Sequence, residues 1–311
     1  MRILVTGGAG FIGSNLCQRL LADGHEVIAV DNLITSSKKN ILPLTSHPKF
    51  KFINHDITKP FPKILSSKFS ILNSIYHLAC PTGVPNLGPL AEEMLLTCAL
   101  GMRNILELAR STGAKVLFTS SSEVYGDPQV FPQTEEYTGN VDPIGHRSPY
   151  EEGKRFAESL IVMYVKKHKV NAKIVRVFNT YGPGMLLEES RVIPRFLGQA
   201  LAGELLTIHG KGQQKRTFCY VDDLVDGLIL VMEKGKIGEV HNLGSDKPIA
   251  IRDLAQMILE VTNSKSKIKF VERPAHDHQS RHPALTKVKK LGWRPKTSLK
   301  TGLKKTLLHY Q

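Results

Sequence analysis

Two residues of the 311-residue sequence, Tyr150 and Lys154, have the types and the spacing needed for acid–base chemistry. On a helix, positions four apart share one face, so the ammonium of Lys154 can lie beside the phenol of Tyr150. A neighbouring positive charge favours the ionised phenol and makes it a better base. The pair therefore indicates proton transfer coupled to redox chemistry.

A glycine-rich loop, TGGAGFIG at residues 6–13, predicts where a dinucleotide would bind. Its glycines allow a tight turn and bring a pyrophosphate close to a helix N-terminus, where free N–H groups and the helix dipole favour anions. Asp31 ends the next predicted strand, where a carboxylate can accept hydrogen bonds from the adenosine ribose and would repel a 2′-phosphate. We therefore expect NAD, with NADP as the alternative because Lys38 and Lys39 are close by.

Further cofactor contacts are expected around the ends of the first strands. Asp56, after the third predicted strand, is a candidate adenine contact, and a simple turn aspartate is the alternative. The full set of expected cofactor contacts is Gly7, Gly10, Phe11, Ile12, Gly13, Asp31, Asn32, Asp56, Ile57, Leu78, Tyr150 and Lys154.

The elements that must position these residues follow from the hydrophobic periodicity of the first 180 residues. Short apolar runs predict strands at Ile3–Val5, Val27–Asp31, Phe50–Asn54, Ser74–Ala79, Lys115–Thr119 and Lys173–Phe178. Helical periodicity covers Ile12–Asp23, Leu90–Ser111 and Pro149–His168. Such alternation predicts an α/β fold with a doubly wound parallel sheet covered by helices on both faces. We expect Ser148 to cap the third helix and Glu151 to complete a capping box.

After Phe178 the pattern loosens, and helical runs recur at Val221–Glu233, Ile251–Thr262 and Ser298–Leu308. We expect residues 1–178 to form a cofactor-binding domain that takes back a return segment, 217–240. Residues 179–311, without that segment, are expected to form a smaller substrate-binding domain. The substrate should lie in the cleft between them, outside the carboxyl ends of the strands.

Composition indicates which binding partners and which cellular compartment to expect. The formal net charge is +14, but many lysines lie between helical apolar positions near the C-terminus, so a solvated basic face is favoured over contact with an anionic surface or steering of an anionic substrate, and no nucleic-acid partner is expected. The four cysteines lack the spacing of a zinc site or a disulfide framework, and no metal is expected. A strand beginning at Arg2 leaves no room for a signal peptide, and no long apolar run follows. We expect a cytoplasmic protein without membrane contact.

Several motifs together carry a resemblance to a known family. In chain order they are TGGAGFIG, YHLA at 76–79, SSSEVYGDP at 120–128, Tyr150-x-x-x-Lys154, FNTYGP at 178–183 and LGWRP at 291–295. Over essentially the whole chain they resemble the extended short-chain dehydrogenase/reductase family of nucleotide-sugar enzymes. Within it, INHDI, DPIGHRSPYEEGKR and SRHP at 280–283 are most similar to UDP-glucuronic acid decarboxylases, which make UDP-xylose.

This resemblance implies a Rossmann fold, bound NAD, a UDP-sugar substrate and a role for each matching residue. Ser121 would hydrogen-bond the C4 hydroxyl of the sugar, Tyr150 would remove its proton, and Lys154 would tune Tyr150 and hold the nicotinamide ribose. The resulting C4 ketone is β to the C6 carboxylate, so the electrons released with CO2 can delocalise into it. The resemblance also implies a homodimer built on the Leu90–Ser111 and Pro149–His168 helices.

For the carboxylate end of the sugar, the resemblance points to Glu123 and Arg281. Sugar 4,6-dehydratases typically have Asp-Glu where this chain has Ser122-Glu123, which favours the decarboxylase. For the nucleotide half it points to Asn179, Arg191 and Arg216, because guanidinium groups bind diphosphate oxygens bidentately, and, as a minor candidate beside uracil, to His209.

Three departures from the family pattern bear on the substrate. Cys98 replaces an asparagine, residues 80–88 lack a tyrosine that decarboxylases place near the sugar, and Ala284 replaces an aspartate. We interpret Cys98 as a packing residue rather than a nucleophile. The alternatives are a nucleotide-sugar 4-epimerase or 4,6-dehydratase using the same oxidation step, and a catalytically silent NAD-binding sensor.

Overall fold

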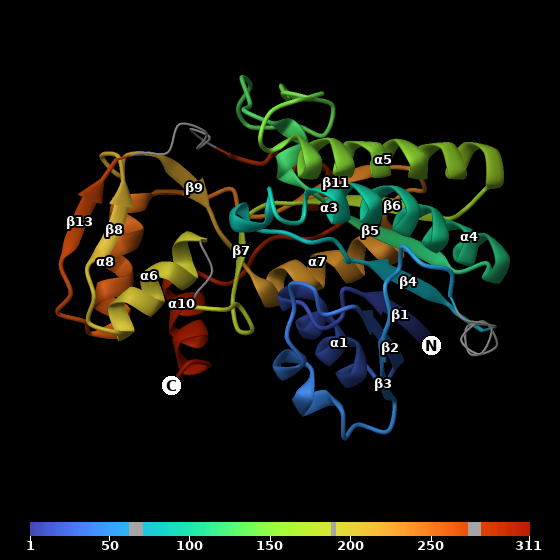
Figure 1. Ribbon diagram of the computed structural model, residues 1–311, viewed down its shortest axis with the longest axis horizontal. Helices are drawn as coiled ribbons and strands as arrows, with labels where there is room; N and C mark the ends of the chain where they lie inside the picture. Colours follow the sequence, from blue (N-terminus) through green and yellow to red (C-terminus); the bar gives the residue numbers. More distant parts are fainter. Residues whose placement is uncertain (62–70, 188–190, 273–280) are drawn as a thin grey trace.

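The computed structural model describes residues 1–61, 71–187, 191–272 and 281–311, which form a larger and a smaller lobe (Figure 1). Within these residues the larger lobe is built on a seven-stranded sheet with the order β11-β6-β5-β4-β1-β2-β3, in which every pairing is parallel. The strands are β1 (Arg2–Thr6), β2 (Glu26–Asp31), β3 (Phe50–Asn54), β4 (Ser74–His77), β5 (Lys115–Ser121), β6 (Ala172–Val177) and β11 (Val240–Leu243).

Helices cover both faces of this sheet, as predicted. One face carries α3 (Ala91–Leu96), α4 (Met102–Thr112) and α5 (Ser148–His168), and the other carries α1 (Phe11–Ala22) and α7 (Val221–Lys234) (Figure 1). Successive side chains of a strand point to opposite faces of a sheet. Along β1, Ile3 and Val5 therefore belong to one buried cluster and Leu4 belongs to the other, so each face is apolar and is covered by helices. The predicted doubly wound α/β sheet is therefore confirmed, with β11 as an additional strand.

The smaller lobe is built mainly from residues after β6. It pairs β8 (Leu206–His209) with β13 (Ile268–Val271) and β9 (Lys215–Thr217) with β12 (Pro248–Ala250), and packs α6 (Val192–Leu201) against α8 (Ile251–Thr262). The short pair β7 (Thr180–Tyr181) and β10 (Cys219–Tyr220) lies beside α7 and α10 (Leu299–Leu308). The remaining elements are α9 (Thr286–Lys290), the 3-10 turns η1 (Lys38–Asn40), η2 (Leu42–Leu44), η3 (Val84–Asn86) and η5 (Ser122–Tyr125), and the π-helical turn η4 (Thr97–Gly101).

The predicted start of α5 is wrong in one respect. Ser148 is already the first helical residue, the cap position belongs to Arg147, and no side chain caps the helix. The Glu151 carboxylate instead accepts a hydrogen bond from Arg147 Nε at 3.3 Å. The capping-box motif is therefore present in the sequence but is not used as one, because Glu151 pairs with a charged side chain.

Candidate active site

A cleft of about 1250 Å³ opens where the carboxyl ends of β1 and β4 meet and the strand order reverses. In doubly wound folds this is where ligands bind. Both lobes line it, and every residue expected to form the site lies along it. They are Gly7, Gly10, Phe11, Ile12, Gly13, Asp31, Asn32, Asp56, Ile57, Leu78, Ser121, Glu123, Tyr150, Lys154, Asn179, Arg191, His209, Arg216 and Arg281.

The glycine loop is a close-packed turn between β1 and α1. Gly7 has a φ of 70°, and a Cβ built on it would lie 2.8 Å from the backbone nitrogen of Ala79. A Cβ on Gly13 would collide with the carbonyl oxygen of Gly7. Helix α1 starts after Gly10 without a side-chain cap and without an acidic residue in its first turn. Its first N–H groups are therefore available to a pyrophosphate, so the loop fits a dinucleotide.

Asp31 lies at the end of β2 and is held against the glycine loop. Its Oδ2 accepts a hydrogen bond from Ala9 N at 3.0 Å, and its Oδ1 accepts from Leu33 N at 2.9 Å and Ser36 Oγ at 2.8 Å. The carboxylate is thus fixed where a ribose would lie. Asp56 Oδ1 accepts from the backbone and hydroxyl of Thr58, so this residue stabilises a turn while it also lines the cleft.

Tyr150 and Lys154 lie one turn apart on α5, and both are at the cleft. Lys154 Nζ donates to the carbonyl oxygen of Thr119 at 2.9 Å and lies 5.7 Å from the centre of the Tyr150 ring. Burial raises the pKa of Tyr150 to about 12, while the charge of Lys154 and a hydrogen bond with Ser121 act to lower it. The predicted electrostatic role of Lys154 matches this geometry.

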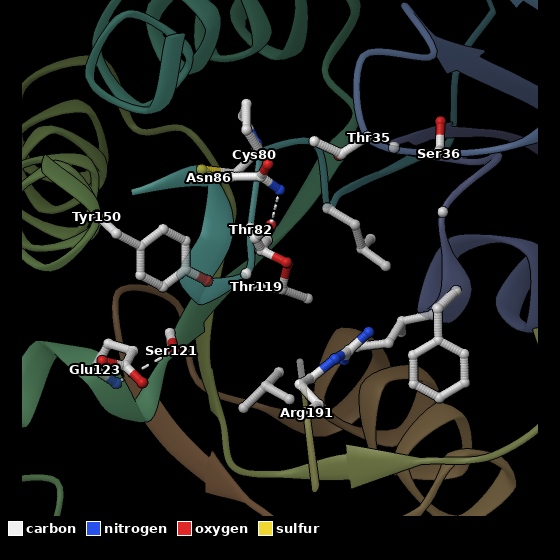
Figure 2. A pocket seen from close by; sticks show the side chains of 18 of the residues that line it. Thr35, Ser36, Cys80, Thr82, Asn86, Thr119, Ser121, Glu123, Tyr150 and Arg191 are labelled. Atoms are coloured by element: carbon white, nitrogen blue, oxygen red, sulfur yellow. Dashed lines mark hydrogen bonds between the residues drawn. The ribbon is translucent and has the colours of Figure 1, made fainter. Parts of the chain in front are cut away.

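Ser121 ends β5 and faces the cleft below the Tyr150 ring (Figure 2). Its Oγ accepts a hydrogen bond from the backbone N–H of Glu123 at 3.2 Å, which begins the short 3-10 turn η5. The same turn places Glu123 on this wall, whereas Arg191 lies on the opposite side in Figure 2.

Glu123 is held between two arginines. Arg147 Nη2 donates to its Oε2 at 2.5 Å, and Arg281 Nη1 donates to its Oε1. Burial acts to raise the pKa of Glu123, but Arg281 and Arg147 outweigh it and hold this pKa well below its usual range. The cleft that Tyr150 lines therefore also contains a fixed carboxylate anion and two guanidinium groups.

Arg147 was not among the residues selected from the sequence. It precedes α5 in a turn, and its role depends on Glu123, which lies 24 residues earlier in the chain. The available signal was its position directly before SPYEEGK, the segment that contains Tyr150 and Lys154. Arg147 and the residue before it, His146, line the same cleft.

On the opposite wall, Arg191 lies at the start of α6 with its guanidinium carbon 5.7 Å from the centre of the Phe11 ring. Arg216 comes from β9, and Asn179 follows β6. All three line the cleft. His209, at the end of β8, also lines it.

The family model named "NAD dependent epimerase/dehydratase family" matches residues 3–244 of the chain. The chain belongs to this family. The match ends one residue after β11, which completes the large sheet.

Relatives and solved structures in this epimerase/dehydratase family cover nearly the whole chain. UDP-glucuronic acid decarboxylase 6 of Arabidopsis thaliana is 45% identical over 305 residues, which are 97% of this chain and 87% of the relative. The structure of UDP-glucose 4-epimerase from Thermotoga maritima with UDP-glucose has a TM-score of 0.90, with 30% identity, 100% of this chain and 98% of that chain covered. UDP-glucuronic acid 4-epimerase from Bacillus cereus, with UDP-glucuronic acid and NAD, has a TM-score of 0.89, with 29% identity, 99% of this chain and 98% of that chain covered.

The departures from the family pattern occupy different places in the fold. Cys98 is buried in the π-helical turn η4, and its Sγ lies 3.8 Å from the Sγ of Cys80. The changed residues 80–87 line the cleft, where Asn86 Nδ2 donates to Thr82 O at 2.6 Å. Ala284 lies outside it; its backbone N–H donates to Gln133 O, and its carbonyl oxygen accepts from Asn242 Nδ2.

Among residues 1–61, 71–187, 191–272 and 281–311, no group of His, Cys, Asp and Glu has the arrangement of a metal site. In the same ranges, no helix combines the length and the apolar composition needed to cross a bilayer.

Proposed function

We propose that this protein converts UDP-glucuronate to UDP-xylose and CO2 through a transient C4 ketone, with NAD as a bound cofactor. The observation that carries this proposal is Glu123 between Arg147 and Arg281, in the same cleft as the Tyr150–Lys154 pair. The named decarboxylase relatives, at up to 45% identity, support it. The larger lobe would hold NAD and the smaller lobe the nucleotide, with the sugar between them.

The hydroxyl oxidation is assigned to α5 and the end of β5. Tyr150 removes the proton of the sugar C4 hydroxyl, Ser121 orients that hydroxyl, and Lys154 stabilises the phenolate by its charge. Bound NAD would accept the hydrogen at C4 and return it after CO2 is lost. The glycine loop, the N-terminus of α1 and Asp31 would hold the cofactor.

The decarboxylation step is assigned to Glu123 and its arginines. Arg281 positions the substrate carboxylate, because a guanidinium group binds carboxylates bidentately. Glu123, which is held ionised, disfavours that carboxylate by repulsion and so promotes its loss as CO2. A carboxylate with such a low pKa is a poor proton donor, so we do not assign Glu123 as the donor of the C5 proton.

Incubation of the purified protein with UDP-glucuronate tests this function. Release of CO2 and a UDP-pentose detected by mass spectrometry are expected. A UDP-sugar product that keeps six carbons in the sugar would instead support the epimerase or dehydratase alternative. The likeness to UDP-glucuronic acid 4-epimerase is the observation that favours this alternative. Retention of NAD without turnover of any nucleotide sugar would favour the silent sensor.

We further propose that two copies associate through α3, η4 and α5. Exposed apolar side chains lie on these elements, namely Leu95, Leu100, Phe156 and Met163. Sedimentation should give a dimer for the wild type and a monomer for Phe156→Glu.

A cytoplasmic location is proposed because a reducing compartment suits four cysteines that are all free thiols.

A further inference from the structure

Two cysteines that are separated in the sequence meet at the wall of the cleft. Cys80 follows β4 and lines the cleft, and Cys98 lies in the π-helical turn η4 between α3 and α4. Their sulfur atoms are 3.8 Å apart, and both are free thiols. Figure 2 shows the Cys80 side chain on the same side of the cleft as Tyr150.

We propose that Cys80 and Cys98 form an oxidisable dithiol that closes to an intramolecular disulfide when the protein meets a low-molecular-weight peroxide. A disulfide has a sulfur–sulfur distance of about 2.05 Å, so the two sulfur atoms must approach by roughly 1.7 Å. Cys80 lies at the start of the irregular segment that follows β4 and is partly exposed. Cys98 is the buried partner, so most of the movement falls to Cys80.

The surroundings assign different roles to the two thiols. The hydrogen bond with Cys98 and the charge of Lys154 lower the pKa of Cys80 to about 7, against the opposing effect of burial. The hydrogen bond with Cys80 and burial raise the pKa of Cys98. Since the thiolate is the nucleophile, Cys80 reacts first and Cys98 resolves the product.

The reaction balances with hydrogen peroxide as the oxidant. The Cys80 thiolate attacks one peroxide oxygen, the O–O bond breaks, and the departing hydroxide takes a proton to become water. Cys80 is then a sulfenic acid. The Cys98 sulfur loses its proton and attacks the Cys80 sulfur, the S–O bond breaks, and a second water leaves. Two thiols are oxidised by two electrons, and one peroxide is reduced to two waters.

The cysteine pair lies close both to the part of α5 that carries Lys154 and to the glycine loop. A Cβ built on Gly153, the residue before Lys154, would lie 3.4 Å from the Cβ and Sγ of Cys98. Ala79, the residue before Cys80, packs its backbone against Gly7 of the glycine loop. A disulfide would therefore tie the end of β4, beside the glycine loop, to the helix segment that packs on α5.

Peptide mapping after peroxide treatment tests the proposal on the wild-type protein. Free thiols are alkylated after exposure to hydrogen peroxide, and the digest is analysed by mass spectrometry with and without dithiothreitol. We expect one linked pair of peptides that joins Cys80 to Cys98, has two hydrogens fewer than the separate peptides, and separates on reduction. Cys17 and Cys219, both buried, should stay unoxidised.

Variants separate the roles of the two thiols. Cys98→Ser keeps a hydrogen-bonding group beside Cys80 but cannot form the disulfide, so it should accumulate a sulfenic acid at Cys80 that dimedone captures. The matched control Cys17→Ser should keep the Cys80–Cys98 link. Oxidation of wild-type Cys80 without a link to Cys98, a link between two chains, or an unreactive Cys80 would each overturn the proposal. None of these readouts requires turnover, so their failure would leave the proposed function unaffected.

Discussion

Arg147 donates from both Nε and Nη2 to a single oxygen of Glu123, Oε2, at 3.2 and 2.5 Å. The other oxygen, Oε1, accepts from Arg281. Both guanidinium groups are thus already paired with an anion before any substrate carboxylate arrives. In the proposed mechanism, Glu123 therefore has opposite effects on substrate binding and on decarboxylation, since it occupies the arginines and also repels the carboxylate that is to be lost.

Replacing Glu123 by Gln should separate these two effects. Without the negative charge, Arg147 and Arg281 are free to pair with the substrate carboxylate, so KM for UDP-glucuronate should fall. The destabilisation of that carboxylate disappears, so kcat should fall by about 100-fold. Steady-state kinetics measure both, with Glu204→Gln on an exposed loop as the control. A raised KM with an unchanged kcat would contradict this assignment.

The Glu123 carboxylate should also make stability depend on pH. Its pKa in the folded protein is lower than in the unfolded chain, so its contribution to stability is present above the unfolded pKa, about 4.3, and is lost as the pH falls further. The difference in Tm between wild type and Glu123→Gln should be largest near pH 7 and shrink below about pH 4. Thermal unfolding followed by circular dichroism at several pH values measures this difference in Tm. A difference in Tm that does not change with pH would contradict the prediction.

The Tyr150–Lys154 pair should determine how activity responds to alkaline pH. In the proposed mechanism the phenolate is the active form, so kcat should rise with pH towards the pKa of Tyr150, which burial raises and Lys154 lowers. Lys154→Met removes the lowering charge and should move this rise to higher pH, at a cost of about tenfold in rate at fixed pH per pKa unit. Exposed Lys166→Met is the control, and an unshifted profile in Lys154→Met would argue against electrostatic tuning.

Tyr150→Phe should abolish this pH response altogether. The ring packing is retained but the proton acceptor is lost, so kcat should fall by about 10²–10⁴. The amount of bound NAD should equal that of the wild type. It is measured by absorbance after the protein has been denatured and the released NAD separated. Unchanged turnover would remove Tyr150 from its assigned role as the base.

Gly13→Ala should impair NAD binding. The added Cβ collides with the carbonyl oxygen of Gly7, which forces the loop away from the N-terminus of α1. Calorimetric titration should show NAD affinity reduced by at least about tenfold, or about 1.4 kcal/mol. Gly198→Ala, in α6 and outside the cleft, is the matched control because its new Cβ makes only ordinary contacts of 3.4 Å or more. Equal NAD affinities of Gly13→Ala and Gly198→Ala would contradict the prediction that the glycine loop holds the pyrophosphate.

Periodic segments were predicted well because burial of one face imposes the pattern that reveals them. The predicted ranges Phe50–Asn54 and Ile251–Thr262 coincide with β3 and α8. Helix α6 was not predicted, and it carries Pro194 in its first turn. The predicted run Leu90–Ser111 is helical from Ala91 onwards, but it is divided by the π-helical turn that places Cys98. Nothing in the periodicity distinguishes that turn from an ordinary helix.

The contacts that define the site chemically could not be obtained from local patterns. Glu123 meets Arg147 across 24 residues and Arg281 across 158, and Cys80 meets Cys98 across 18. Such meetings depend on how the sheet and the two lobes pack, which no local sequence pattern specifies. Resemblance to the family supplied Glu123 and Arg281, whereas Arg147 and the cysteine pair required the structure.

The position of β11 in the sheet constrains how the chain can be assembled. Its neighbour β6 is complete at Val177, yet β11 begins only at Val240, after β7, α6, β8, β9, β10 and α7. During synthesis, a nascent chain that ends near residue 178 would present β6 as an unpaired edge, a surface that invites association with other chains. The larger lobe therefore becomes a closed folding unit only after the strand that ends at Leu243 has been made.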